Sequence, residues 1–144
     1  MQLTEHFSLE ELTFSSTAKR LQIDNSASGD IQANLLVTAT GLEAVRNLLA
    51  APMHIDSGFR CPQLNLAVRG AQDSAHLTGF AADFTCTQVG TPLDIVRLIQ
   101  QSHIDFDQLI QEGTWVHISF APALRRQVLT AHFGPGGTTY SLGD

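Results

Sequence analysis

Two histidines and an aspartate have the residue types and the spacing of a hydrolytic metal site. His76 and Asp83 stand seven residues apart, and His117 lies in the hydrophobic segment Trp115-Val116-His117-Ile118-Ser119. Two imidazoles and one carboxylate can bind zinc and leave a fourth coordination position for water, as hydrolytic zinc sites require. The pattern predicts a metal-dependent hydrolase.

The residues around these three candidates favour their convergence. Gly79, between His76 and Asp83, permits a positive φ or a close backbone approach. On a strand over residues 115–120, the two-residue period places His117 on the face opposite to Val116 and Ile118, away from the core. A single histidine is more often structural or solvated than a ligand. We therefore assign no metal role to the remaining histidines, which are His6, His54, His103 and His132.

The elements that must position these residues can be read from hydrophobic periodicity and from turn and cap residues. Ser8 and Glu11 fit the capping box of a short helix. Further helices are expected over 30–49, over 63–68 and from the cap at Thr91 to about residue 102. Strands are expected over 53–57, 80–85, 106–111 and 115–120, the last two as a hairpin. The tail over 134–144 is the least determined part.

Length and composition exclude several classes of protein. The chain has 144 residues, 43% of them hydrophobic and 15% charged, which suits one globular domain over 1–144. No apolar run approaches the length of about 18 residues that a membrane span needs. The net charge of −6 argues against nucleic acid as a partner. The first residues lack a secretory signal, so cytoplasmic synthesis is expected. Cys61 and Cys86 do not make a disulfide framework, and free thiols are the favoured interpretation.

Three ordered motifs resemble the M15 family of zinc peptidases, which includes D-alanyl-D-alanine carboxypeptidases and phage endolysins. They are Ser57-Gly58-Phe59-Arg60, the pattern SxHxxGxAxD over residues 74–83, and Trp115-Val116-His117. Asn65, Gly70, the segment over 106–112 and the opening over 7–12 are similar to subgroup A of that family, the small cell-wall peptidases. The resemblance implies that His76, Asp83 and His117 bind Zn²⁺ and that Arg60 anchors the substrate.

Other cleft residues are assigned roles that the sequence leaves open. A guanidinium can hold a peptide carboxylate or carbonyl through paired hydrogen bonds, which agrees with the role implied for Arg60. Ser74 could bind substrate or orient its loop. Trp115 could line the cleft or fill the core. Asp56, Asp73 and Gln108 could support the ligating histidines.

The catalytic base is the point at which the chain departs from the family pattern. Several members carry an acid three positions before the last histidine, where this sequence has Thr114. Glu112 is then the best candidate, with Asp107 as the fallback and a solvated turn residue as the structural alternative. Strict strand alternation would put Glu112 and His117 on opposite faces, so a turn or bulge through Gly113 and Thr114 is needed.

The fold expected from these features is α+β, with a small, mainly antiparallel sheet bearing the metal site and helices on one side, similar to hedgehog domains and D-Ala-D-Ala peptidases. The expected function is zinc-dependent cleavage of peptidoglycan stem peptides, as a carboxypeptidase or an endopeptidase. We expect a monomer that reaches the cell wall through a phage or prophage lysis or tail system, by analogy only. The alternative is a zinc-stabilised, non-catalytic binding module of hedgehog-like fold.

Overall fold

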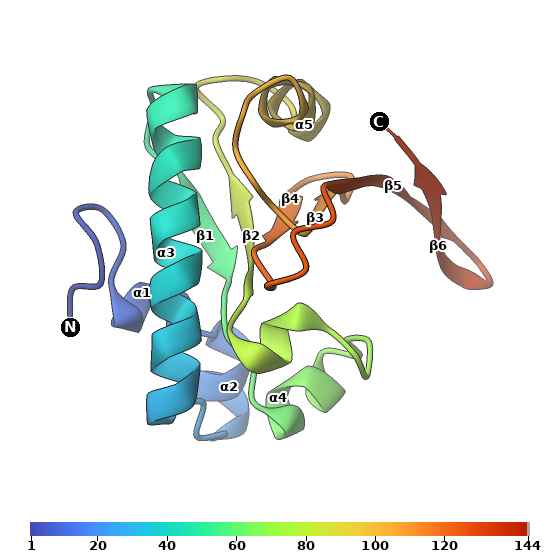
Figure 1. Cartoon of the computed structure of the whole chain (residues 1–144). Coiled ribbons are helices and arrows are strands. Elements are labelled where there is room, and N and C mark those ends of the chain that lie inside the picture. Colours follow the sequence, from blue (N-terminus) through green and yellow to red (C-terminus); the bar gives the residue numbers. More distant parts are fainter. Residues whose placement is uncertain (144) are drawn as a thin grey trace.

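A six-stranded sheet runs through the protein, with helices packed around its first strands and its last two strands projecting away from the helices (Figure 1). The computed structural model describes residues 1–143, so the last residue of the expected domain and tail lies outside the described residues. In chain order, the elements are α1 (Leu9–Thr13), α2 (Ser16–Leu21), α3 (Gly29–Leu49), β1 (His54–Ser57), α4 (Pro62–Ala67), the 3-10 helix η1 (Ala75–Thr78), β2 (Ala81–Thr85), α5 (Pro92–Gln100), β3 (Gln108–Gln111), β4 (Val116–Ser119), β5 (Gln127–Gly134) and β6 (Gly137–Leu142).

The strands lie in the order β1-β2-β4-β3-β5-β6. Every neighbouring pair is antiparallel except β3 and β5, which are parallel. The expected α+β class with a mainly antiparallel sheet therefore agrees with the structure, although the sheet is mixed. The closer likeness to hedgehog domains stays a prediction.

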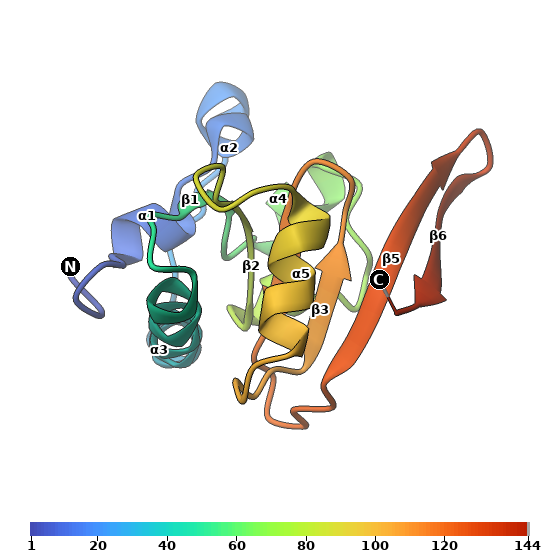
Figure 2. The same cartoon turned by 90° about the horizontal axis from the view of Figure 1, so that it is seen from above.

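Helix α3 begins one residue before the predicted start and ends at the predicted residue. Ala50 ends it in the left-handed conformation, with φ of 53°, and donates its N–H to the Arg46 carbonyl. This is a common way to satisfy the last carbonyls of a helix. Helix α5 begins with the complete capping box of Thr91 and Asp94. These two helices lie on the same side of the sheet (Figure 2).

Side-chain alternation separates a core face of the sheet from a site face. Ala82 and Phe84 of β2, and Val116 and Ile118 of β4, are fully buried in the hydrophobic core. The same cluster includes apolar residues of α3 and α5, namely Leu35, Ala39, Leu42, Val45, Leu49, Ile95, Val96 and Ile99. Asp83 and His117 alternate with these core residues and therefore occupy the opposite face.

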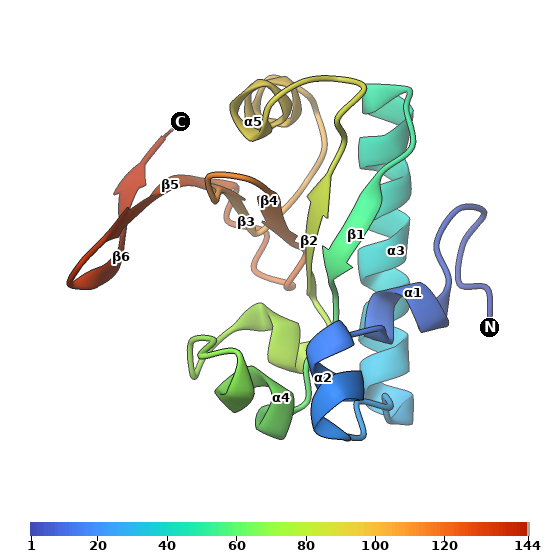
Figure 3. The ribbon, with the colours of Figure 1, turned by 180° about the vertical axis from the view of Figure 1, so that it is seen from behind.

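The remaining helices position the site from one end of the sheet. In the view from behind, α1, α2 and α4 gather below β1 and β2, while α5 lies at the other end (Figure 3).

Neither α2 nor the β5–β6 hairpin was predicted from the sequence, and both are present. Within residues 1–143, no helix combines the length and the apolar character needed to cross a membrane.

Candidate metal centre and cleft

His76 is held by a short helical turn and by one backbone carbonyl. The Ser74 hydroxyl caps η1 by accepting from the His76 N–H at 3.2 Å. Gly79 ends the turn with φ of 83°, where a side chain would be strained and a Cβ would lie 3.2 Å from Ile31 and Leu35. Both roles predicted for this glycine, the positive φ and the close approach, are thus observed.

Asp83 and His117 are direct cross-strand partners in the antiparallel pair of β2 and β4. Cross-strand pairs on one face have the shortest side-chain separations in a sheet. His117 Nδ1 lies 2.9 Å from Asp83 Oδ1, and His76 Nε2 lies 3.1 Å from the same oxygen. The sequence-predicted triad is therefore brought together, with one ligand atom from each residue within 4.8 Å of the others.

The hydrogen bonding of His76 leaves its Nε2 as an electron-pair donor directed at a carboxylate. His76 Nδ1 lies 2.6 Å from the Gly58 carbonyl oxygen, which can only accept, so Nδ1 carries the proton. Burial, the largest influence, lowers the pKa of His76 and favours the neutral ring. In that state Nε2 and Asp83 Oδ1 are two acceptors facing each other, an arrangement that a shared cation would stabilise.

The residues fit a zinc ion. Bonds of about 2.0–2.1 Å at tetrahedral angles separate two ligand atoms by about 3.3 Å, close to the two separations measured at Asp83. The Gly58 carbonyl is the kind of outer partner that fixes the orientation and tautomer of a ligating histidine. For His76 this partner is backbone, and not Asp56, Asp73 or Gln108.

Asp83 is electrostatically suited to remain ionised. Burial raises its pKa, but the interactions with the imidazoles of His76 and His117 outweigh burial and hold the pKa well below its usual range. A carboxylate that stays charged is a competent metal ligand at neutral pH.

Arg60 lies beside the triad with unused hydrogen-bonding capacity. One terminal N–H donates to the Ser74 hydroxyl at 3.3 Å, while the buried Nε has no partner among the described residues. Burial lowers the Arg60 pKa, and the charges of Asp83 and Glu112 oppose that effect. An unsatisfied buried donor of this kind can be completed by an acceptor oxygen of a bound molecule.

Glu112 lies on the site face because it continues the alternation of β3. It follows Gln108 and Ile110, which line the same cleft, and the turn through Gly113, with φ of 83°, sets it opposite Trp115, to whose carbonyl the Glu112 N–H donates at 3.0 Å. The turn that the prediction required thus puts Glu112 and His117 on one face. Burial raises the Glu112 pKa, with a smaller upward contribution from Asp83, while His117 and Arg60 act in the opposite direction. Thr114 is exposed in the same turn. Glu112 is thus a half-buried carboxylate beside the triad.

Asp107, the fallback base, is committed to another contact. Its two carboxylate oxygens accept from Arg125 Nε at 2.8 Å and from a terminal N–H of Arg125 at 2.9 Å. These hydrogen bonds are the main reason that the Asp107 pKa is lowered. A carboxylate with a lowered pKa and two occupied oxygens is a poor proton acceptor, which leaves Glu112 as the better candidate.

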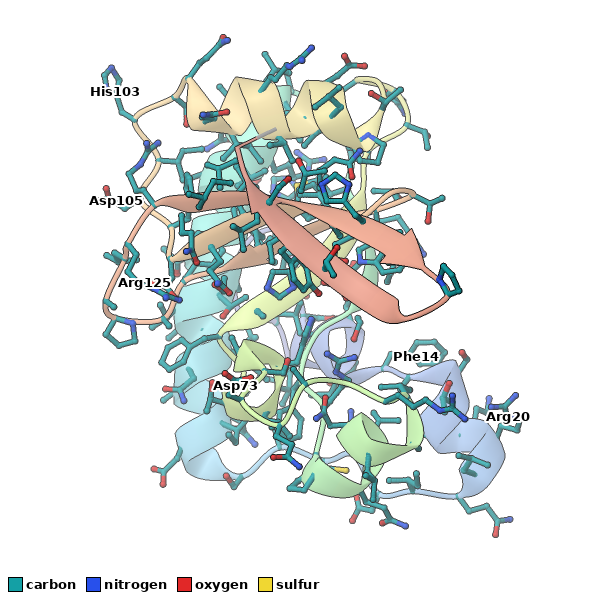
Figure 4. All side chains as sticks on the ribbon, turned by 90° about the vertical axis from the view of Figure 1, so that its right-hand side faces the viewer. Phe14, Arg20, Asp73, His103, Asp105 and Arg125 are labelled. Atoms are coloured by element: carbon teal, nitrogen blue, oxygen red, sulfur yellow. The ribbon has the colours of Figure 1, made fainter. Side chains whose placement is uncertain are left out.

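These residues open onto one cleft of about 700 Å³. The triad, Arg60, Ser74, Glu112 and Trp115 all line it. For Trp115 the cleft position, rather than the core position, is therefore observed. Figure 4 looks at this side of the molecule, with Asp73 below the β5–β6 hairpin and Arg125 to its left, and both residues line the cleft.

Several groups at the site were not predicted from the sequence. The Gly58 carbonyl belongs to the backbone and cannot be recognised from residue types, although Gly58 itself lies in one of the three motifs. Arg125, Phe133 and Tyr140 line the cleft from the part of the chain that the motifs did not reach. Both cysteines are free, as expected, and Cys86 donates to the Pro52 carbonyl at 3.2 Å.

The chain matches one known family. Residues 5–119 match the family model described as Peptidase M15. No curated protein matches the chain. The matched range contains all three residues of the triad, together with Arg60, Ser74, Glu112 and Trp115.

Proposed function

Since this chain belongs to the Peptidase M15 family, whose members are metallopeptidases, we propose that it is a zinc-dependent peptidase of peptidoglycan stem peptides. The observation that carries this proposal is the facing pair of acceptors, His76 Nε2 and Asp83 Oδ1, 3.1 Å apart at the cleft. A structural histidine–aspartate pair would place a proton between these atoms, whereas the bond to Gly58 uses the proton of the neutral ring.

His76 Nε2, His117 Nδ1 and one Asp83 oxygen would hold the metal. When bound, zinc supplies Lewis acidity and activates a water molecule for attack on a carbonyl. The backbone around these ligands keeps them in place: Gly58 and Ser74 fix His76, and the register of β2 and β4 fixes the other two. The protein thus presents a preformed donor set.

Glu112 is assigned the proton transfers. Its carboxylate takes a proton from the attacking water and then delivers it to the leaving amine. The raised pKa suits this double role, because an acid with a pKa nearer to the working pH can both accept and release a proton. The neighbouring positive charge of Arg60 opposes further protonation.

Arg60 is assigned the anchoring of the substrate. Its free Nε–H and its terminal N–H groups form a planar set of donors that matches a carbonyl or carboxylate. As the carbonyl oxygen gains negative charge, these donors stabilise it. Ser74, which already accepts from Arg60, fixes the guanidinium at the edge of the cleft.

The cleft carries charges of both signs. It is lined by Arg60, Arg69 and Arg125 and by Asp73, Asp83, Asp107 and Glu112, and Arg125 is paired with Asp107. Arg60 and Arg69 are therefore the cations that could bind a carboxylate of a stem peptide. Both a terminal D-alanine and an internal peptide bond are compatible with this cleft, and delivery by a phage lysis or tail system is part of the same proposal.

The test compares the zinc-loaded native protein with Glu112→Gln on purified peptidoglycan, with released fragments identified by mass spectrometry. We expect metal-dependent release by the native protein and a loss of about 10²–10⁴-fold in the variant. Glu5→Gln is the matched control, because its side chain is 84% exposed and lies outside the cleft. Zinc binding without release by the native protein would favour the non-catalytic binding module instead.

A further inference from the structure

The β5–β6 hairpin is part of the cleft but lies outside the matched range of residues 5–119. It joins the sheet through the parallel pairing of β5 with β3, and β6 is exposed along its whole length. Figure 4 shows the hairpin crossing in front of the sheet, on the side where the cleft opens. The hydrophobic core does not require this projecting hairpin. The residues that the hairpin contributes to the cleft therefore need another explanation.

The two faces of the hairpin differ. Phe133 is paired with Thr138, and Tyr140 is paired with Ala131, so these side chains share one face. Phe133, Thr138 and Tyr140 line the cleft. On the other face, His132 Nε2 and the Ser141 hydroxyl lie 2.7 Å apart, away from the cleft. The aromatic residues are therefore segregated to the cleft face.

Both aromatic side chains are available for contact. Phe133 is 59% exposed and Tyr140 is 52% exposed, and neither belongs to the hydrophobic core. The Phe133 ring lies beside the turn that holds Glu112, since a Cβ on Gly113 would be 3.2 Å from its Cε2 atom. Tyr140 lines the same cleft as Glu112 and Asp83, and burial, followed by the charges of these two carboxylates, raises the Tyr140 pKa.

We propose that the β5–β6 hairpin is a specificity-determining wall of the cleft, and that Phe133 and Tyr140 contact the peptide of the substrate beside the bond to be cut. This inference rests on the proposed function. The loop that carries Asp73 and Ser74 lines the other part of the cleft, so a bound peptide would lie between that loop and the hairpin.

The chemistry of the wall suits a peptide with small apolar side chains. An aromatic face gives a peptide a large contact area at a low cost in side-chain entropy. Tyr140 adds a hydroxyl that can bond a peptide carbonyl or amide. Because the rings are beside Glu112 and are not ligands of the metal, they would act mainly on substrate binding and less on the chemical step.

The test measures hydrolysis of a synthetic stem pentapeptide by the zinc-loaded protein. In the double variant Phe133→Ala/Tyr140→Ala, we expect KM to rise about tenfold, as for the loss of two aromatic contacts, with kcat changed by less than about threefold. Tyr140→Phe separates the ring from the hydroxyl. Thr139→Ala is the matched control, since Thr139 is exposed on the opposite face of the same hairpin, and thermal unfolding checks that each variant is folded.

The outcomes separate this inference from the proposed function. If the native protein hydrolyses the peptide and the double variant has unchanged KM, the hairpin inference is overturned while the function stands. If the native protein does not hydrolyse it, binding of the same peptide to zinc-loaded Glu112→Gln protein is titrated with and without the two hairpin substitutions. Weaker binding in the hairpin variant then supports the wall, and equal or undetectable binding overturns it.

Discussion

Zinc should stabilise the native protein against unfolding, and the substitution Asp83→Asn should remove most of that stabilisation. The three ligand atoms lie within 4.8 Å of one another only because η1, β2 and β4 are assembled. An unfolded chain does not hold these distant residues together, so zinc binds the folded state in preference. By linkage, that preference appears directly as stability.

The magnitude follows from the same linkage. At a free zinc concentration 100 times the Kd, the native protein gains about 2.7 kcal/mol, or about 8 °C in Tm for a chain of this size. Asp83→Asn replaces an anionic ligand with a neutral amide, and we expect the affinity to fall by at least about 100-fold. At the same zinc concentration the variant would gain at most about 0.4 kcal/mol, or about 1 °C.

Thermal unfolding in zinc-buffered solutions, followed by circular dichroism, measures both shifts. Asp73→Asn is the control, because Asp73 lines the same cleft as an exposed carboxylate outside the triad. It should keep the full stabilisation. An equal zinc-induced shift in Asp83→Asn and in the native protein would refute the assignment of the site.

Three further predictions concern the residues around the triad. Gly58→Ala should lower the free energy of unfolding by about 1–3 kcal/mol in urea titrations, because its Cβ would lie 2.2 Å from the Leu12 carbonyl oxygen; an unchanged midpoint would contradict this close approach. Arg60→Lys should lower kcat/KM by about 10–100-fold while zinc-induced stabilisation is retained, since the charge remains but the planar donor set is lost; full activity would exclude the anchoring role. Because Glu112 must be ionised to accept a proton and burial raises its pKa, kcat/KM should fall as the pH decreases through a value above the ordinary glutamate pKa of about 4.3. The pH profile of Glu112→Gln should lack this acidic fall in kcat/KM. The same fall in the residual activity of the variant would assign the titration to another group.

The parts of the fold that were predicted from sequence have strong local signals. Helix α3 carries a long apolar periodicity, and α5 has a cap, a first-turn proline and an acidic first turn. The strands β2 and β4 bear the ligands within recognisable motifs. Alternation predicted that His117 lies away from the core, whereas the pairing of β2 with β4, which sets Asp83 opposite His117, was not predicted.

The parts that were missed depend on contacts distant in sequence or on the backbone. Strand β6 is exposed throughout, so burial imposes no alternating pattern on it, and β5 is defined by its pairing with β3 and β6. Helix α2 has six residues and buries only Ala18, too little for a periodic signal. The bond from His76 to the Gly58 carbonyl involves a main-chain group, which every residue has. The Asp107–Arg125 pair joins residues separated by β4.

The amino-terminal helix is connected to the metal ligand through two successive backbone groups. The Leu12 carbonyl accepts from the Phe59 N–H at 2.8 Å, and the adjacent Gly58 carbonyl holds His76. Residues far from the cleft therefore restrain the orientation of one imidazole. A change to the first helix would therefore act on the His76 imidazole through the peptide unit that joins Gly58 and Phe59.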